Sequence, residues 1–142
     1  MKAQIDRVHV WSAEIEDQPG ALAEKLQVLS DAGASLEFVV SRRSHEKPGA
    51  GVVFATPIAG VKQMRAAKEA GFAKSDSLHS LRFSSGDKAG LGAEVTGLLA
   101  EAGINLRGFS GAAIGRKAVF HFAFDSEADA AKAQRLLKKK RS

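Results

Sequence analysis

The sequence predicts an α+β fold made of two tandem β-α-β-β-α-β repeats, each an antiparallel sheet with its helices on one face. Three observations lead to this prediction. A stretch of the chain recurs after 70 residues, leucines recur at helical spacing within it, and short runs rich in Val, Ile and Phe flank it. The fold class therefore rests on a repeat and on the alternation of helical and strand periodicity.

The repeat is the most specific of these observations. Residues 16–36 (EDQPGALAEKLQVLSDAGASL) align without a gap with residues 86–106 (GDKAGLGAEVTGLLAEAGINL). Extended back to residue 2, the same register gives 11 identities over the 36 positions from 2 to 37. Chance would give roughly two or three identities in a chain of ordinary composition. We therefore interpret the chain as a tandem duplication.

The first copy begins with a strand, predicted over residues 8–15 because Val, Trp and Ile alternate loosely with other residues there. A helix follows, because Leu22, Leu26 and Leu29 lie at helical spacing, and Gly33 stands where a C-terminal cap is expected. The rest of the copy is predicted to contain two strands, a helix ended by Gly71 and a short closing strand, over residues 36–43, 51–57, about 60–70 and 72–77.

The second copy has the same order of elements. We predict a strand over residues 78–84, a helix that carries Leu91, Val95, Leu98 and Leu99, strands over residues 105–114 and 117–124, and a helix opened by Ser126 as N-cap. This order is that of the ferredoxin-like, or split β-α-β, arrangement. The second copy has no closing strand of its own, because its last helix runs into a basic tail.

The missing strand leads to a prediction about how the two copies close. We place the first repeat at residues 1–71 and the second at residues 72–142. Residues 2–7 (KAQIDR) align with residues 72–77 (FAKSDS), the closing strand of the first copy. We therefore expect residues 1–7 to complete the sheet of the second copy.

The composition excludes several classes of protein. The chain has 142 residues, of which 44% are hydrophobic and 26% charged, as is typical of a folded globular protein. It has no cysteine, so disulfides, thiolate zinc sites and cysteine nucleophiles are excluded. Its apolar runs are too short to span a bilayer, and its N-terminus lacks the apolar core of a signal peptide. We therefore expect a cytoplasmic protein without a membrane partner.

The net charge of +5 permits anionic partners. Much of the excess lies in residues 138–142 (KKKRS), which are typical of a solvated helix end. An RNA-binding module is one alternative, since Phe120, Phe122 and Phe124 share one face of a strand and RNA-recognition domains of this topology stack bases on strand aromatics. The sequence lacks the R-G-F-G-F-V-x-F pattern of that family. A hydrophobic core or an oligomer face is therefore favoured, and nucleic acid is not the expected partner.

The repeated unit resembles the ACT domain, the small regulatory module of amino-acid metabolism. The resemblance rests on a strand ending in Asp-x-Pro-Gly-x-Leu (residues 17–22), a helix, and an AGINL-type entry (residues 102–106) into the next strand. It covers nearly the whole chain, twice over. It implies a non-catalytic protein that binds a small ligand, usually an amino acid, where two domains pair side by side. The ligand is then held by the loop between the first strand and first helix of one domain and by the start of the neighbour's second strand.

Carried onto this sequence, the resemblance gives two candidate ligand sites. The favoured site keeps the family pattern in both halves and consists of Asp17, Gln18, Pro19, Gly20, Ala21, Leu22, Ile104, Asn105 and Leu106. The second, weaker site consists of Asp87, Lys88, Ala89, Gly90, Leu91 and Gly92 with Ala34, Ser35 and Leu36. The second is weaker because Ala89 replaces the proline, Gly92 the leucine and Ser35 the asparagine.

The residue types of the favoured site suit an amino acid. A helix N-terminus offers unpaired N–H groups and partial positive charge to an α-carboxylate. Gly20 lets a ligand approach the backbone, and Pro19 occupies a first helical position, where the missing donor is not needed. Asp17 can accept the ammonium group, and Asn105 offers a donor and an acceptor. Asp17 is also interpreted as a helix cap and turn residue.

No pattern in the sequence indicates catalysis, a cofactor or a metal. Neither a G-x-S-x-G motif nor paired acids in a recognisable context are present, and His9 and His79 have no neighbouring metal-binding residues in the sequence. We expect a protein that is not an enzyme and that acts through a regulated enzyme or regulator protein, or as a homodimer. A trans-acting regulator that no longer binds a ligand is a further alternative.

Overall fold

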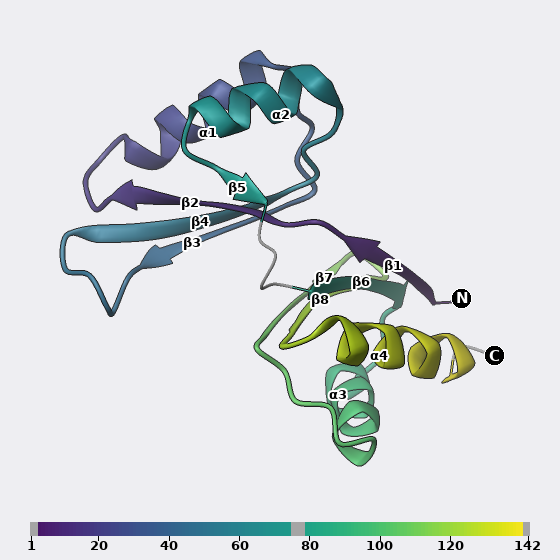
Figure 1. Cartoon of the computed structure of the whole chain (residues 1–142). Coiled ribbons are helices and arrows are strands. Elements are labelled where there is room, and N and C mark those ends of the chain that lie inside the picture. The colour runs from purple at the N-terminus through teal and green to yellow at the C-terminus, as the bar shows by residue number, and fades with distance from the viewer. Residues whose placement is uncertain (1–2, 75–78, 141–142) are drawn as a thin grey trace. The chain divides into compact units, whose positions relative to one another are not determined.

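The computed structural model describes residues 3–74 and 79–140 and contains two α+β units (Figure 1). Contacts divide the chain into a first unit, His9–Ser75, and a second unit, Met1–Val8 with Asp76–Ser142. The elements are β1 (Gln4–Val8), β2 (Trp11–Glu16), α1 (Ala21–Asp31), β3 (Phe38–Arg43), β4 (Ala50–Thr56), α2 (Gly60–Glu69), β5 (Ala73–Lys74), β6 (His79–Gly86), α3 (Leu91–Glu101), β7 (Gly108–Ile114), β8 (Lys117–Phe124) and α4 (Glu127–Lys140). The predicted pair of ferredoxin-like units is confirmed.

The first unit is a four-stranded antiparallel sheet in the order β3-β4-β2-β5, with α1 and α2 on one face (Figure 1). Residues that alternate along β2 and β4 point toward the helices and are buried, among them Trp11 and Val53. Leu29 of α1 and Ala67 of α2 are fully buried in the same core. The alternate residues of the strands and the leucines at helical spacing therefore pack together in one apolar layer.

The N-terminal strand lies in the second unit. β1 runs antiparallel to β6, with Ile5 opposite Phe83 and Val8 opposite Ser80. The strand order β1-β6-β8-β7 gives β1 the edge position that β5 holds in the first unit. The contacts change unit between Val8 and His9, and Phe72 with β5 stays in the first unit rather than opening the second at residue 72. Of the predicted closing strand, residues 75–77 lie outside the described residues.

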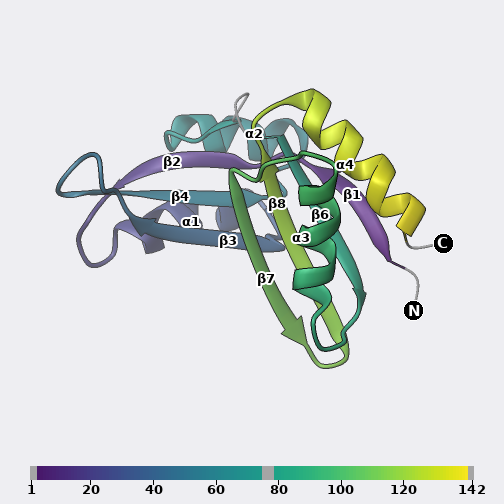
Figure 2. The same ribbon diagram turned by 90° about the horizontal axis from the view of Figure 1, so that it is seen from below.

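The core of the second unit lies between this sheet and the helices α3 and α4. Figure 2 shows both helices in front of the sheet, with β7 at the uncovered edge. Phe122 and Phe124 of β8 are 1% and 0% exposed, and they pack with Leu81, Leu99 and Leu137 from the neighbouring strand and the helices. The aromatic run of β8 is therefore a core feature.

Equivalent glycines end the first helix of each unit. Gly33 has φ +87° and Gly103 has φ +76°. In the first unit the N–H of Gly33 donates to Ser30 and that of Ala34 donates to Leu29, which is the Schellman arrangement. The second unit repeats both hydrogen bonds. The prediction of glycine C-caps is confirmed, and Ser126, whose Oγ accepts the N–H of Asp129 at 3.1 Å, is confirmed as the N-cap of α4.

Several predicted strands begin later than the sequence pattern indicated. The strand predicted over residues 8–15 is β2, which begins at Trp11, and Val8 belongs to β1. β3 begins at Phe38 rather than at residue 36, and β7 begins at Gly108 rather than at residue 105. In both units the residues between the glycine cap and the strand form a connection, from which Leu36 and Leu106 pack onto the core. Because these buried leucines are apolar, the connection looks like the start of a strand in the sequence.

An ion pair fastens β1 to α4. Arg7 donates from Nη1 and Nη2 to Oε1 and Oε2 of Glu127 at 2.7 and 2.6 Å, and Nδ1 of His79 lies 3.3 Å from Oε2. The hydrogen bonds from Arg7 lower the pKa of Glu127 to about 2 and raise the pKa of Arg7. The N-terminal strand is thus held by a bidentate charge pair in addition to its backbone ladder.

Replacing Ile5 by Ala tests the contribution of β1 to the second unit. Ile5 is 4% exposed within the core of that unit. Its truncation is expected to lower the free energy of unfolding of the second unit by about 2–5 kcal/mol. Amide hydrogen exchange of β6 measures this loss. Gln4→Ala, at an exposed position of the same strand, is the control and should change stability by less than about 0.5 kcal/mol. Equal protection of β6 in both variants would contradict this role of β1.

Glu127→Gln tests the ion pair through its pH dependence. Because the folded chain lowers the pKa of Glu127 from 4.5 to about 2, the stabilisation is present above about pH 4.5 and is lost as the pH falls toward about 2. The variant should therefore be less stable than the wild type at pH 7, and the difference should shrink across this window. Urea unfolding at a series of pH values measures it.

Asp129→Asn is the matched control for this experiment. It removes another carboxylate of the first turn of α4, one without an ion-pair partner among the described residues. This control should leave most of the pH dependence in place. A constant difference between Glu127→Gln and the wild type from pH 7 to pH 2 would refute the assignment.

Candidate functional site

The loop between β2 and α1 holds the first half of the favoured sequence-predicted site. The N–H of Asp17 donates to the carbonyl of Gly49 at 3.0 Å and prolongs the pairing of β2 with β4. The chain then turns through Gln18 and Pro19 to Gly20, which is the N-cap of α1 with φ +90°. Residues 17–20 are all exposed. The loop therefore presents an open backbone at the mouth of a helix.

Asp17 is not the helix cap that the sequence suggested. α1 has Gly20 as its N-cap and no side-chain cap hydrogen bond. The Asp17 carboxylate instead pairs with Arg43 of β3, with 2.9 Å between Oδ2 and Nε. The left-handed turn at Gly20 places α1 one turn further along the chain than a cap at Asp17 requires. For the same reason Pro19 precedes the N-cap rather than occupying the first helical position.

Two backbone donors in the first turn of α1 have no acceptor among the described residues. The N–H of Ala21 donates to Gln18 and that of Glu24 donates to Gly20. The amides of Leu22 and Ala23 have no hydrogen-bond partner within the part of the chain that the structure describes. Together with the partial positive charge of a helix N-terminus, these amides can receive an anionic group.

The second half of the favoured site lies between α3 and β7 of the second unit. Ile104 is 5% exposed and belongs to the core, so its side chain is not open to a ligand. Asn105 is exposed, and its Oδ1 accepts the N–H of Leu106 at 2.9 Å. Its amide NH₂ remains as the donor. The two halves belong to different units, and their union in one site stays a prediction.

The corresponding loop of the second unit differs in its charges. Gly90 repeats the left-handed N-cap, with φ +82°, and Asp87 repeats the backbone bond of Asp17 by donating its N–H to Arg116 at 2.8 Å. Lys88, whose side chain is 62% exposed, pairs with Glu94 of α3 at 3.0 Å. Of the residues assigned to the weaker site, Asp87, Lys88 and Leu91 line one cavity of the second unit.

The remaining residues of the weaker site lie in the first unit, in the connection between α1 and β3. The N–H of Ala34 completes the glycine cap of α1, Leu36 packs on the core, and Ser35 is exposed. Their pairing with residues 87–92 also stays a prediction.

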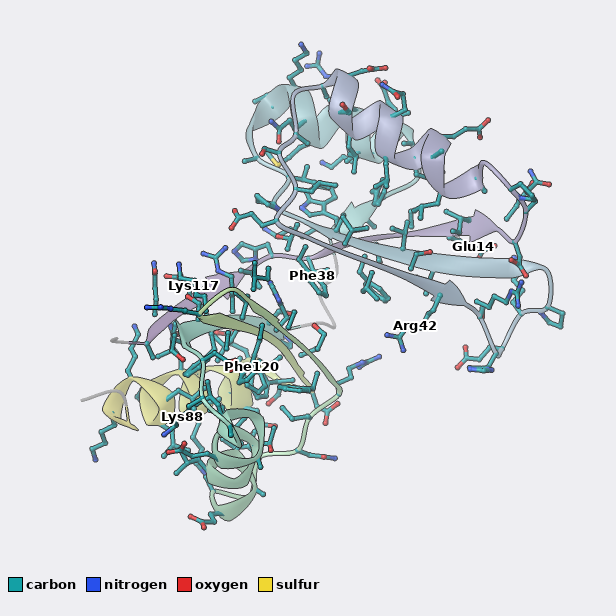
Figure 3. The ribbon with its side chains drawn as sticks, turned by 180° about the vertical axis from the view of Figure 1, so that it is seen from behind. Glu14, Phe38, Arg42, Lys88, Lys117 and Phe120 are labelled. Atoms are coloured by element: carbon teal, nitrogen blue, oxygen red, sulfur yellow. The ribbon has the colours of Figure 1, made fainter. Side chains whose placement is uncertain are left out.

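The phenylalanines of β8 do not form an RNA-stacking face. Phe120, Phe122 and Phe124 are at most 8% exposed and face the helices. Figure 3 shows Phe120 between the sheet and the helices of its unit. Phe109, 45% exposed, lies against Phe120 and Phe122 on this face. RNA-binding aromatics need a solvent-exposed sheet face, so the alternative based on these side chains is wrong. Lys138 and Lys139 are exposed at the end of α4.

Sequence reasoning missed two features of the loops. Arg43, the partner of Asp17, is 26 residues further along the chain, and only the sheet brings the two together. The second is the apolar floor of the cavity beside Asp87, to which Ala3, just before β1, and Leu137 of α4 contribute from opposite ends of the chain. Among the described residues no cluster of three His, Asp or Glu side chains could hold a metal ion. No described helix is long and apolar enough to cross a membrane.

Comparisons with known proteins agree with this architecture. The family model of the ACT domain matches residues 12–70 and 79–141. The chain therefore belongs to the ACT domain family, and two regulatory modules of that family make up most of its length. A search of the curated proteins finds no match.

Solved structures share the fold across almost the whole chain. A protein from Bacteroides thetaiotaomicron is 22% identical, with 96% of this chain and 90% of that chain covered and a TM-score of 0.77. The regulatory subunit of aspartate kinase from Thermus thermophilus, in its ligand-free form, is 13% identical, with 98% and 96% covered and a TM-score of 0.66. A structure of aspartokinase alpha and beta subunits is 19% identical, with 98% and 96% covered and a TM-score of 0.65.

Gly20→Ala tests the left-handed turn that opens α1. A β-carbon at Gly20 would meet no atom within 4 Å, so the effect isolates the backbone conformation at φ +90°. We expect a loss of about 1–2 kcal/mol in the free energy of unfolding. Gly97→Ala is the matched control, because Gly97 lies inside α3, also with nothing within 4 Å. It should stabilise the protein by about 0.5–1 kcal/mol. Thermal unfolding of both variants measures the contrast, and effects of the same sign would contradict it.

Proposed function

We propose that the chain is a sensor that binds an amino acid and passes the signal to a partner enzyme of amino-acid metabolism or to a second copy of itself. Membership of the ACT family supports a regulatory role with a small ligand. The observation that carries the proposal is the loop of Asp17–Leu22. It carries the carboxylate of Asp17 and leads into two helix amides that have no partner among the described residues, so that groups of opposite charge can be received a few residues apart.

In the proposed binding mode the amides of Leu22 and Ala23 take the ligand's carboxylate, and Asp17 takes its ammonium group. The proposal keeps Asn105 and Leu106 as the other half of the site, with Asn105 supplying its NH₂, and leaves out the buried side chain of Ile104. The pair of Asp17 with Arg43 does not obstruct this mode, because Arg43 is 83% exposed. An exposed ion pair contributes at most about 1 kcal/mol, less than a charge-assisted hydrogen bond to an ordered ammonium group.

Self-association is proposed through β7. This strand lies at the edge of its sheet, carries no charged residue, and includes Phe109 and Ile114, which are 45% and 72% exposed. An uncharged edge strand with exposed apolar side chains is a template for pairing with another strand. A second copy of the chain carries the same edge strand, so a homodimer formed through β7 would cover the edge of both copies.

The decisive experiment compares Asp17→Ala with Arg43→Ala. In a thermal-shift screen of the twenty amino acids, the cognate ligand at about a hundred times its Kd should add about 2.7 kcal/mol, a shift of several degrees. Asp17→Ala should abolish this shift. Arg43→Ala, which breaks the same ion pair but keeps the carboxylate, should retain or increase it.

The two variants separate a ligand contact from a structural ion pair. Equal loss of response in both would mean that Asp17 acts only through Arg43. An absence of response from the wild type across the whole panel would overturn the sensor function itself and favour the ligand-independent regulator.

A further inference from the structure

The second helix of each unit carries the same row of three exposed cations. The 70-residue repeat continues through these helices, so that residues 62–69 of α2 align with residues 132–139 of α4. The identical positions within this stretch are all exposed cations, and the residues between them differ. The basic row of α2 consists of Lys62, Arg65 and Lys68, and the basic row of α4 consists of Lys132, Arg135 and Lys138.

The two basic rows lie on corresponding faces of their helices. Ala67 and Leu137, which precede the last cation of each row, are 0% and 1% exposed and belong to the cores of their units. Each helix lies on one face of its own sheet (Figure 1), and the cations, three residues apart, are turned away from that core. The structure places little constraint on exposed positions. Identity at these positions and divergence between them therefore indicate that the cations serve a partner outside the core.

The stability of the helix does not account for the row of α2. A cation near a helix C-terminus complements the helix dipole, as Lys68 does. Lys62 instead lies in the first turn of α2, where a positive charge opposes the dipole. Neither these two lysines nor Arg65 has an ion-pair partner among residues 3–74 and 79–140. The three charges are thus open to an external anion.

The row of α4 has the more positive surroundings. Lys139 extends it at the position where α2 has Glu69. The Nζ of Lys132 donates to the carbonyl of Ala102 at 2.9 Å, and because this acceptor is neutral the ammonium charge is kept. The first unit has as many acidic as basic residues, so the whole net charge of +5 belongs to the second unit. We therefore expect α4 to attract an anionic partner more strongly than α2 does.

The composition of the two helices distinguishes duplex DNA from other anionic partners. Protein interfaces are depleted in lysine and enriched in aromatic residues. A helix that lies on a membrane turns an apolar face to the lipid, whereas the apolar faces of α2 and α4 are buried in their own cores.

Other nucleic acids require side chains that these helices lack. Single strands are bound by aromatic side chains on which bases stack, and double-stranded RNA is recognised partly through its 2′-hydroxyl groups. The exposed side chains described for α2 and α4 include no aromatic ring, hydroxyl or amide. Lysine and arginine without such groups suit the phosphate backbone of a DNA duplex.

We propose that the basic rows of α2 and α4 are docking surfaces for double-stranded DNA, which they bind through its phosphates without reading its sequence. Each row spans about 9 Å along its helix. A duplex carries one phosphate charge per about 1.7 Å of its axis, so each row meets several phosphates. The surface uses neither the loop of Asp17–Leu22 nor the buried phenylalanines of β8, and it does not depend on the ligand-sensing function.

Fluorescence anisotropy with a labelled DNA duplex of about 20 base pairs, between about 50 and 200 mM salt, tests the proposal on the full chain. The logarithm of the association constant should fall linearly with that of the salt concentration, with a slope of about −0.9 per phosphate neutralised. The triple variant Lys132→Gln, Arg135→Gln, Lys138→Gln should weaken binding and reduce the slope by about 2 to 3. The triple variant Lys62→Gln, Arg65→Gln, Lys68→Gln should have the same effect to a smaller extent. Absence of binding by the wild type would overturn the proposal.

A matched control separates a defined surface from overall charge. The triple variant Arg107→Gln, Arg116→Gln, Lys117→Gln removes three exposed cations of the second unit that lie outside α4. It should change the slope by less than about 1. Circular dichroism checks that each variant keeps its fold. An equal loss of slope in the control and in the α4 variant would mean that binding follows net charge alone, and it would overturn the proposal.

Competing polyanions test the identity of the partner. Tighter binding of duplex RNA or of single-stranded DNA than of duplex DNA, or equal displacement by an oligoglutamate peptide, would overturn the assignment to DNA. Asp17→Ala should bind DNA as the wild type does. An amino-acid response without DNA binding would refute the docking surface and leave the sensor loop standing, whereas DNA binding without an amino-acid response would refute the sensor alone.

Discussion

The pairing of β1 with β6 is the constraint on which the second unit depends. Without it the sheet would consist of β6, β8 and β7, and the apolar face of β6 that carries Phe83 would lie at an open edge. β1 brings Ile5 into the core and Arg7 to Glu127 of α4, so one strand closes the sheet and holds the last helix. The floor of the cavity is completed by Ala3, immediately before this strand. The sheet of the second unit, the position of α4 and the cavity therefore all depend on the N-terminal segment that contains β1.

The two copies show how one backbone plan carries different chemistry. The glycine caps, the left-handed N-caps at Gly20 and Gly90 and the lengths of α1 and α3 are the same, because each depends on backbone conformation. The side chains around the loops differ. The Asp17 carboxylate forms an ion pair with Arg43. The Asp87 carboxylate instead lies beside the Lys88–Glu94 pair and an apolar cavity. After the duplication the side chains around the loops have diverged, whereas the backbone conformation of the two units has stayed the same.

Much of the backbone fold was predictable, because the sequence patterns that indicate it lie close together along the chain. Helix ends follow from Gly33 and Gly103, strand positions from alternation, and the role of β1 from the repeat register. The roles of the loop residues were less accessible. Asp17 has the residue type of a cap, and only the position of β3, which brings Arg43 within 2.9 Å, assigns it to an ion pair. Ile104 reads as a ligand contact in a motif, yet it is buried in the core.

The sequence by itself determined the duplication, the order of elements and the family resemblance, since repeated spacing and short-range periodicity are written along the chain. The tertiary structure decided which side chains meet. It turned the phenylalanines of β8 inward under α3 and α4, because the helices cover the face to which the alternate residues of that strand point. It also set Ser85 above a cavity whose walls come from both ends of the chain, a long-range contact that no local pattern encodes.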